Sequence, residues 1–135
     1  MADIINNIVG GRYYILELIG RGGSAIVYKA RDIHNGGIYA LKKYITSDPA
    51  NRKRLLEGME RELEVLKNCT HPVLPKIFDL IKIEDAFFLV MEYIDGIDLK
   101  KYVDEYGTLS TKMLVKVVEQ VCSGFYYLHS LSPAI

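Results

Sequence analysis

Hydrophobic and polar residues alternate through much of the first two thirds of the chain, which is the spacing of β-strands. Runs of this kind occupy residues 13–19, 25–31, 38–45, 77–83 and 87–92. Turn-forming residues separate them, most clearly a glycine cluster at residues 20–24. Because alternating runs joined by short turns pair side by side, the five runs predict an antiparallel sheet.

A helical period appears once between these strands and again near the end of the chain. An Asp-Pro start predicts a helix at residues 48–68, which ends before the proline that follows His71. A short helix is predicted at residues 98–106 and a long one at residues 110–131. The long helix carries an apolar stripe of Leu114, Val117, Val118, Val121, Phe125 and Leu128. Five antiparallel strands, one inserted helix and two closing helices predict an α+β fold.

One carboxylate falls inside an apolar stripe. On a helical wheel, the inserted helix groups Leu55, Met59, Leu63 and Leu66 on one side, and Glu62 lies among them, whereas Glu57, Glu60 and Glu64 point away. A carboxylate directed at a core is costly unless a cation meets it. Lys42, at the end of the third strand, is the candidate partner. A lone lysine is more often a solvated surface residue, so this pairing depends on Glu62 and on the glycine turn upstream.

Composition and charge narrow the functional classes. The chain has 135 residues, of which 50% are hydrophobic, and its 17 basic residues balance 17 acidic ones. This balance gives no electrostatic case for binding nucleic acid or an anionic membrane. The longest apolar run, at residues 86–91, is far too short to cross a bilayer, and the first residues do not resemble a signal peptide. We expect a cytoplasmic protein in which Cys69 and Cys122 are reduced, mostly buried thiols.

The glycine cluster and the third strand carry the candidate chemistry. The cluster opens a strand and lacks a following Gly-Lys-Ser/Thr, which excludes a dinucleotide fold and a P-loop. Taken alone, it fits a plain hairpin turn as well as a loop that covers phosphates, since glycine lets backbone N–H groups approach phosphate oxygens. Ala40 and Lys42 share one face of their strand. A small residue leaves space for a flat adenine, and a lysine two positions on can reach its phosphates.

Together these features resemble the first half of the protein-kinase signature. Gly20, Gly22 and Val27 match G-x-G-x-x-G-x-V, with Ala25 in place of the third glycine, and residues 40–42 match the V-A-I-K region. The stretches GGSAIVYKA, HPVLPKIFD and FYYLHSLSP are similar to bacterial Ser/Thr kinases of the eukaryotic-like type. The resemblance implies an N-terminal lobe with a five-stranded antiparallel sheet and helix αC, a hinge, and the first two helices of the C-terminal lobe.

The resemblance also implies residue roles and domain bounds. Lys42 and Glu62 correspond to the catalytic lysine and the αC glutamate that holds it. The implied ATP-contacting residues are Ile19, Gly20, Gly22, Gly23, Ser24, Val27, Ala40, Lys42, Met91 as gatekeeper, Glu92 and Ile94 on the adenine edge, and Asp98 on the ribose. The implied domains are an extension at 1–12, an N-terminal lobe with hinge at 13–94, and a partial C-terminal lobe at 95–135.

The second half of the signature does not occur in this sequence. It contains no H-R-D and no D-F-G, and therefore none of the residues that bind Mg²⁺ in the family. We expect this chain to be inactive alone, with no metal site, and its protein substrate stays unassigned. The apolar stripe of the last helix is expected to lie exposed and to form a homodimer; it could instead fold back on the N-terminal lobe or stay partly disordered. The alternative function is a non-catalytic regulatory module that binds a nucleotide or a partner.

Overall fold

The computed structural model divides the chain into two compact units. The first contains Met1–Cys69 and Pro75–Tyr93, and the second contains Thr70–Leu74 and Ile94–Ile135. The structure describes residues 4–23, 25–44, 54, 56–57, 60, 63, 66–84 and 86–131.

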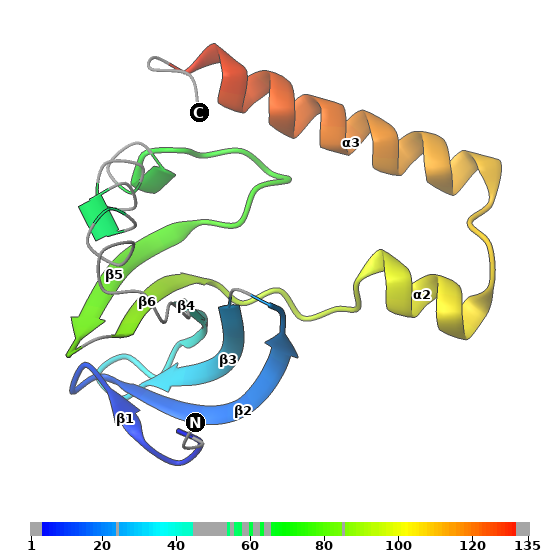
Figure 1. The fold of residues 1–135 in the computed structure, drawn as a ribbon. Helices are drawn as coiled ribbons and strands as arrows, with labels where there is room; N and C mark the ends of the chain where they lie inside the picture. The colour runs from blue at the N-terminus through cyan, green and yellow to red at the C-terminus, as the bar shows by residue number, and fades with distance from the viewer. Residues whose placement is uncertain are drawn as a thin grey trace. The chain divides into compact units, whose positions relative to one another are not determined.

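The first unit is built on a curled antiparallel sheet (Figure 1). Among the described residues it has six strands in the order β1-β2-β3-β4-β6-β5. The strands are β1 (Ile8–Val9), β2 (Tyr13–Arg21), β3 (Ala25–Asp32), β4 (Ile38–Tyr44), β5 (Ile77–Ile83) and β6 (Ala86–Glu92). All five predicted strands are present, and the prediction of five strands is corrected to six by β1. A strand of two residues is too short to show an alternating pattern.

β1 adds residues 8 and 9 to the edge of the sheet. It pairs with β2, with Val9 opposite Tyr13, and both side chains belong to the buried core cluster. Arg12 then reaches Asp32 at the end of β3: its Nη2 lies 2.7 Å from Asp32 Oδ2, and its Nε donates to the same oxygen at 2.8 Å. The hydrogen bond from Arg12 lowers the pKa of the Asp32 carboxyl, whose side chain is fully buried.

One face of the sheet carries the hydrophobic core. The core cluster consists of Val9, Tyr13, Ile15, Ile26, Tyr28, Ala30, Leu41, Phe88 and Val90. These residues alternate along β3 and β6 with side chains that point to the opposite face, such as Val27, Lys29 and Leu89. The opposite face therefore remains available for a site.

Two bulges bend β2 where it approaches the glycine turn. The pairing with β3 shifts between Ile15 and Glu17 and again between Leu18 and Gly20, so Leu16 and Ile19 are the extra residues. Because each bulge absorbs one residue of the alternation, Glu17 and Gly20 both lie on the face opposite the core, although they are three positions apart. Sequence alternation alone would place them on different faces.

The helix predicted at residues 48–68 lies partly outside the described residues. Helical positions are described at 54, 56, 57, 60, 63, 66 and 67. Leu63 is buried and Leu66 half-buried, whereas Glu57 and Glu60 are exposed, as the helical wheel predicts. The predicted helix start at Asp48-Pro49, and Leu55, Met59, Glu62 and Glu64, lie outside the described residues.

The second unit contains two capped helices, α2 (Leu99–Tyr106) and α3 (Thr111–Ser130). The Asp98 side chain accepts a hydrogen bond from the N–H of Lys101, and Ser110 caps α3 by accepting from the N–H of Met113. These caps explain why both helices begin within one residue of their predicted starts. Neither α2 nor α3 is long and apolar enough to span a membrane.

The loop Thr70–Leu74 packs against α3 within the second unit. The Thr70 N–H donates to the Tyr127 hydroxyl at 3.1 Å, and the His71 imidazole stacks on the Tyr127 ring with centroids 5.1 Å apart. Ser123 Oγ lies 3.2 Å from His71 Nε2. Gly124 is the buried residue of α3, because the loop lies directly over its Cα.

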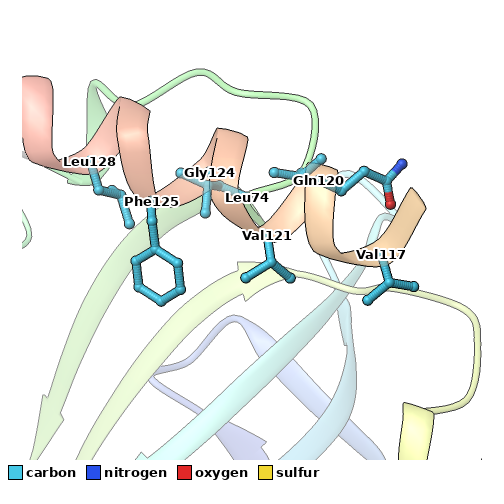
Figure 2. Close-up of a pocket in the computed structure, with 8 residues that line it drawn as sticks. Leu74, Val117, Gln120, Val121, Gly124, Phe125 and Leu128 are labelled. Atoms are coloured by element: carbon cyan, nitrogen blue, oxygen red, sulfur yellow. The ribbon is translucent and has the colours of Figure 1, made fainter. Parts of the chain in front are cut away.

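Much of the apolar stripe of α3 is exposed in the described residues, as predicted. The exposed fractions are 50% for Leu114, 51% for Val118, 49% for Val121 and 57% for Phe125. An apolar hollow of about 300 Å³ lies between this stripe and the loop, lined by Val73, Leu74, Val117, Gln120, Val121, Gly124, Phe125 and Leu128. Figure 2 shows Val117, Val121 and Phe125 projecting from the same side of α3. The predicted homodimer stays a prediction.

The two cysteines differ in exposure. Cys69 is half-buried, whereas Cys122 is exposed on α3. The expectation that both thiols are mostly buried is therefore wrong for Cys122. On the helical wheel it lies between Val115 and Val118, and both of these side chains are exposed as well.

Candidate nucleotide-binding site

Cross-strand register brings the predicted site residues of the sheet into two neighbouring rows. In the first row, Gly20 of β2 lies opposite Val27 of β3, Val27 opposite Lys42 of β4, and Lys42 opposite Leu89 of β6. Directly paired residues of an antiparallel sheet present their side chains on the same face. The glycine turn, the valine after it and the lysine are therefore neighbours in space.

The second row lies two residues along each strand. Ala40 pairs with Met91 of β6 and, on its other side, with Lys29 of β3. Ala40 is only 5% exposed, while Met91 is half-buried. Because Val27 and Ala40 lie on the same face as Lys42, the two rows form a surface with a small apolar centre, flanked by Lys42 in the first row and by Lys29 in the second.

The glycine turn closes as a tight hairpin. The N–H of Gly22 donates to the carbonyl of Ala25 at 2.8 Å. A Cβ added at Gly23 would meet nothing within 4 Å, so the outer side of the turn is open. Ile19 is the bulged residue just before Gly20. Ser24, predicted in this loop, lies outside the described residues.

Lys42 lies in the first row between Val27 and Leu89. Its side chain is half-buried, and its Nζ lies 5.1 Å from the centroid of the Tyr44 ring, two residues along the same strand. Its sequence neighbour Lys43 points to the other face, where its Nζ lies 5.6 Å from the Phe88 ring centroid. The predicted pairing of Lys42 with Glu62 lies outside the described residues and stays a prediction.

Glu92 ends β6 with two hydrogen bonds to a single residue. Its N–H donates to the carbonyl of Lys76 at 2.8 Å, and its Oε2 accepts from the N–H of Lys76 at 3.0 Å. Ile94 and Asp98 belong to the second unit. Ile94 is 66% exposed, and Asp98 uses Oδ1 to accept from the Lys101 N–H at 2.8 Å, which leaves Oδ2 for another partner.

The sequence analysis did not identify three further residues beside this surface, which are Glu17, Lys29 and Tyr93. Lys29 Nζ lies 3.3 Å from Glu17 Oε1 and 4.6 Å from the centroid of the Tyr93 ring. Hydrogen bonds to Tyr93 first, and then to Glu17, raise the pKa of Lys29. Strand alternation could have placed Lys29 beside Val27 on this face. Its partners depend on the β2 bulge and on the course of the chain after β6, which sequence does not reveal.

The described residues show no metal centre. Among them, no group of three or more His, Cys, Asp or Glu side chains could hold a metal ion.

Comparisons with known proteins identify the family of this chain. A family model described as protein kinase domain matches residues 13–133. The serine/threonine-protein kinase PrkC of Bacillus subtilis is 35% identical over 126 residues, which cover 93% of this chain and 19% of PrkC. The human serine/threonine-protein kinase tousled-like 1 is 33% identical over 129 residues, which cover 92% of this chain and 17% of that kinase.

The fold matches a solved kinase structure as well. The crystal structure of Rad53 1–466 in complex with AMP-PNP superposes with a TM-score of 0.75 at 28% sequence identity, and the match covers 88% of this chain and 30% of that chain. The chain spans about a fifth of the length of the curated relatives that it matches. These matches confirm the family resemblance found in the sequence. The chain therefore belongs to the protein kinase domain family, which its residues 13–133 match.

Proposed function

We propose that this chain is the ATP-binding part of a Ser/Thr protein kinase, whose family reaction transfers the γ-phosphate of ATP to a Ser or Thr hydroxyl. The observation that carries the proposal is the register that pairs Val27 with Lys42 and Ala40 with Met91 on one face of the sheet. Rad53, which shares this fold, was solved in complex with the ATP analogue AMP-PNP.

The apolar centre of this face fits an adenine ring. In the proposal, Val27 and Ala40 pack on the flat ring, Ile19 contacts it from the glycine-turn side, and Met91 is the gatekeeper. The methyl group of Ala40 supports this role, since a larger side chain at this position would occupy the space of the ring.

The polar edge of the adenine requires backbone groups at the end of β6. We assign this contact to the backbone of Glu92 and Ile94. The N–H of Glu92 is already bonded to Lys76, so its carbonyl is the group left to accept from the adenine amino group. Asp98 contacts the ribose through Oδ2, because its Oδ1 caps α2.

The phosphates belong at the Lys42 end of the face. Lys42 binds the α- and β-phosphates, Glu62 holds Lys42 in place, and the turn of Gly20, Gly22, Gly23 and Ser24 covers the phosphates. The N–H of Gly22 is bonded to Ala25. The turn must therefore open slightly before this N–H can donate to a phosphate oxygen.

Mg²⁺ accompanies ATP in kinase reactions, but the described residues offer no cluster that could hold a metal ion. We assign no Mg²⁺ ligand and no step through Mg²⁺ to residues 1–135. Because this sequence has no H-R-D and no D-F-G, the 135-residue polypeptide is expected to bind nucleotide without transferring phosphate. Transfer of radiolabelled phosphate from ATP to a protein by the homogeneous chain would contradict this expectation.

Calorimetric titration with Mg-ATP tests the proposal. We expect a dissociation constant on the order of 1 mM, or about −4 kcal/mol, because the chain supplies only part of the pocket. Lys42→Met should weaken binding, whereas Lys43→Met removes the same charge from the opposite face and should leave it unchanged. Equal effects of the two substitutions would show a general charge effect and would contradict a site at Lys42.

A non-catalytic regulatory module is the second candidate function. The exposed apolar stripe of α3 favours it, since such a face is suited to contact with another protein. The same titration separates the two candidates. Saturable ATP binding that depends on Lys42 supports the kinase segment, and no binding at high nucleotide leaves protein contact as the function of these residues.

A further inference from the structure

Tyr93 occupies the position between the two residues that we assign to the adenine edge. It follows Glu92, the last residue of β6, and precedes Ile94, the first residue of the second unit after it. The conformation of this short connection decides where the Glu92 carbonyl and the Ile94 N–H point. Any contact that holds the Tyr93 side chain therefore acts on both groups.

Lys29 provides such a contact from β3. Its Nζ lies 4.6 Å from the centroid of the Tyr93 ring, within the range of a cation–π interaction. The same Nζ lies 3.3 Å from Glu17 Oε1 on β2. The Lys29 side chain is 26% exposed, so this cation is more enclosed than an ordinary surface lysine. The lysine thus links β2 and its own strand, β3, to the connection after β6.

The register places this link beside the adenine surface. Glu17, Lys29, Ala40 and Met91 form one continuous row across four strands. Glu17 reaches this row only because the bulge at Leu16 removes one residue from the alternation. The acid, the cation and the small adenine-facing residue are therefore adjacent on a single face.

The residue before Tyr93, Glu92, is held by Lys76, which lies just before β5, the edge strand next to β6. Glu92 makes two hydrogen bonds to Lys76, which precedes β5, at 2.8 and 3.0 Å. Two consecutive residues are thus attached to different strands, Glu92 toward β5 and Tyr93 toward β3. The backbone between them has little freedom to rotate, and this is the property that recognition of a base edge requires.

We propose that Lys29, held between Glu17 and Tyr93, is a positioning residue for adenine recognition: it fixes the connection that presents the Glu92 carbonyl and the Ile94 N–H to the base. This inference rests on the proposed function. Lys29 does not itself touch the nucleotide in this proposal. Its effect falls on the part of the affinity that comes from the base, whereas the triphosphate is bound at Lys42, in the neighbouring row.

The test compares ligands that carry the adenine with a ligand that lacks it. The ¹³C,¹⁵N-labelled chain of residues 1–135 is titrated with Mg-ATP, Mg-GTP and Mg-tripolyphosphate, and binding is followed by NMR. Lys29→Met should weaken ATP binding about two- to fivefold, the loss expected for a half-exposed cation–π contact. It should lower the ATP-to-GTP affinity ratio and leave tripolyphosphate binding unchanged. Lys29→Arg should restore ATP affinity, because a guanidinium also pairs with an acid and stacks on an aromatic ring.

Arg31→Met is the matched control. Arg31 lies two residues along β3 on the same face and is exposed, so this substitution removes the same charge without touching Tyr93. It should leave the ATP-to-GTP ratio unchanged. Tyr93→Leu should reproduce the effect of Lys29→Met and should also shift the ε-methylene signals of Lys29 downfield, since the ring current of Tyr93 is lost.

Each outcome decides between the inference and the proposed function. Unchanged ATP affinity in Lys29→Met, or an equal loss for ATP and tripolyphosphate, would overturn the positioning role while leaving the ATP site intact. A wild-type chain that binds tripolyphosphate but does not prefer ATP would overturn it as well. If the wild-type chain binds none of the three ligands, the proposed function fails and the positioning role fails with it. Thermal melting of each variant confirms that folded proteins are compared.

Discussion

Replacing Gly124 by alanine should destabilise the second unit, although alanine is the better helix former. Gly124 lies inside α3 with the loop Thr70–Leu74 packed on it. A Cβ built at this position would lie 3.0 Å from Val73 Cγ2 and 3.4 Å from Leu74 Cδ2. The first distance is several tenths of an ångström shorter than an ordinary carbon–carbon contact.

Two opposing effects set the magnitude. Alanine in place of glycine in a helix interior stabilises by about 1 kcal/mol, whereas an extra methyl group in a packed site costs about 1–3 kcal/mol. The loop cannot easily retreat, because the Thr70 N–H is bonded to Tyr127 at 3.1 Å and His71 contacts Ser123 at 3.2 Å. The steric cost should therefore exceed the helix gain, and Gly124→Ala should lose up to about 2 kcal/mol of unfolding free energy.

A double-mutant cycle with Val73→Ala isolates the clash. Shortening Val73 removes the Cγ2 atom that the new methyl group would meet. In the Val73→Ala background, Gly124→Ala should therefore stabilise by about 1 kcal/mol, the helix propensity alone. The coupling free energy between the two substitutions should be about 1 kcal/mol or more. Urea unfolding followed by circular dichroism at the helix band measures all four proteins.

Two results would refute this reasoning. If Gly124→Ala alone stabilised the chain by the full helix propensity, the loop would not lie on α3 as closely as described. If the substitution had the same effect in both backgrounds, Val73 would not be the residue that forces a glycine at this position.

Two further predictions concern other parts of the molecule. The hydrogen bond from Arg12 lowers the pKa of Asp32 in the folded chain. The ionised carboxylate therefore stabilises the fold. This contribution is complete above the unfolded pKa of about 3.9 and is lost as the pH falls through the lower folded pKa. Asp32→Asn should lower the melting temperature at neutral pH and flatten its dependence below about pH 4; a variant that keeps the wild-type acid profile would contradict this. Self-association through α3 should make light scattering depend on concentration, and Phe125→Glu should abolish that dependence. A wild-type monomer at every concentration would rule it out.

The pattern of residues along the chain was enough to predict five of the six described strands, the helices α2 and α3, and the family. Residues 77–83 were predicted as a strand with the bounds that β5 has in the structure, because alternation is a local signal. The starts of α2 and α3 followed from Asp98 and Ser110, since a capping side chain bonds to backbone groups only three residues away. The site residues were carried over by resemblance to the kinase motifs, and their roles stay predictions.

Only the tertiary structure decided what depends on pairing between distant segments. A two-residue strand such as β1 has no period of its own and exists because β2 pairs with it. The bulges at Leu16 and Ile19 appear only when β2 is aligned with β3, and one of them brings Glu17 into line with Lys29. From the sequence alone, Gly124 looks like a residue that weakens its helix. The structure shows why a glycine stands there, because the loop packs directly on it. Periodicity is a property of neighbours in sequence, whereas register and close approach are set by free energies of contacts between residues far apart in the chain.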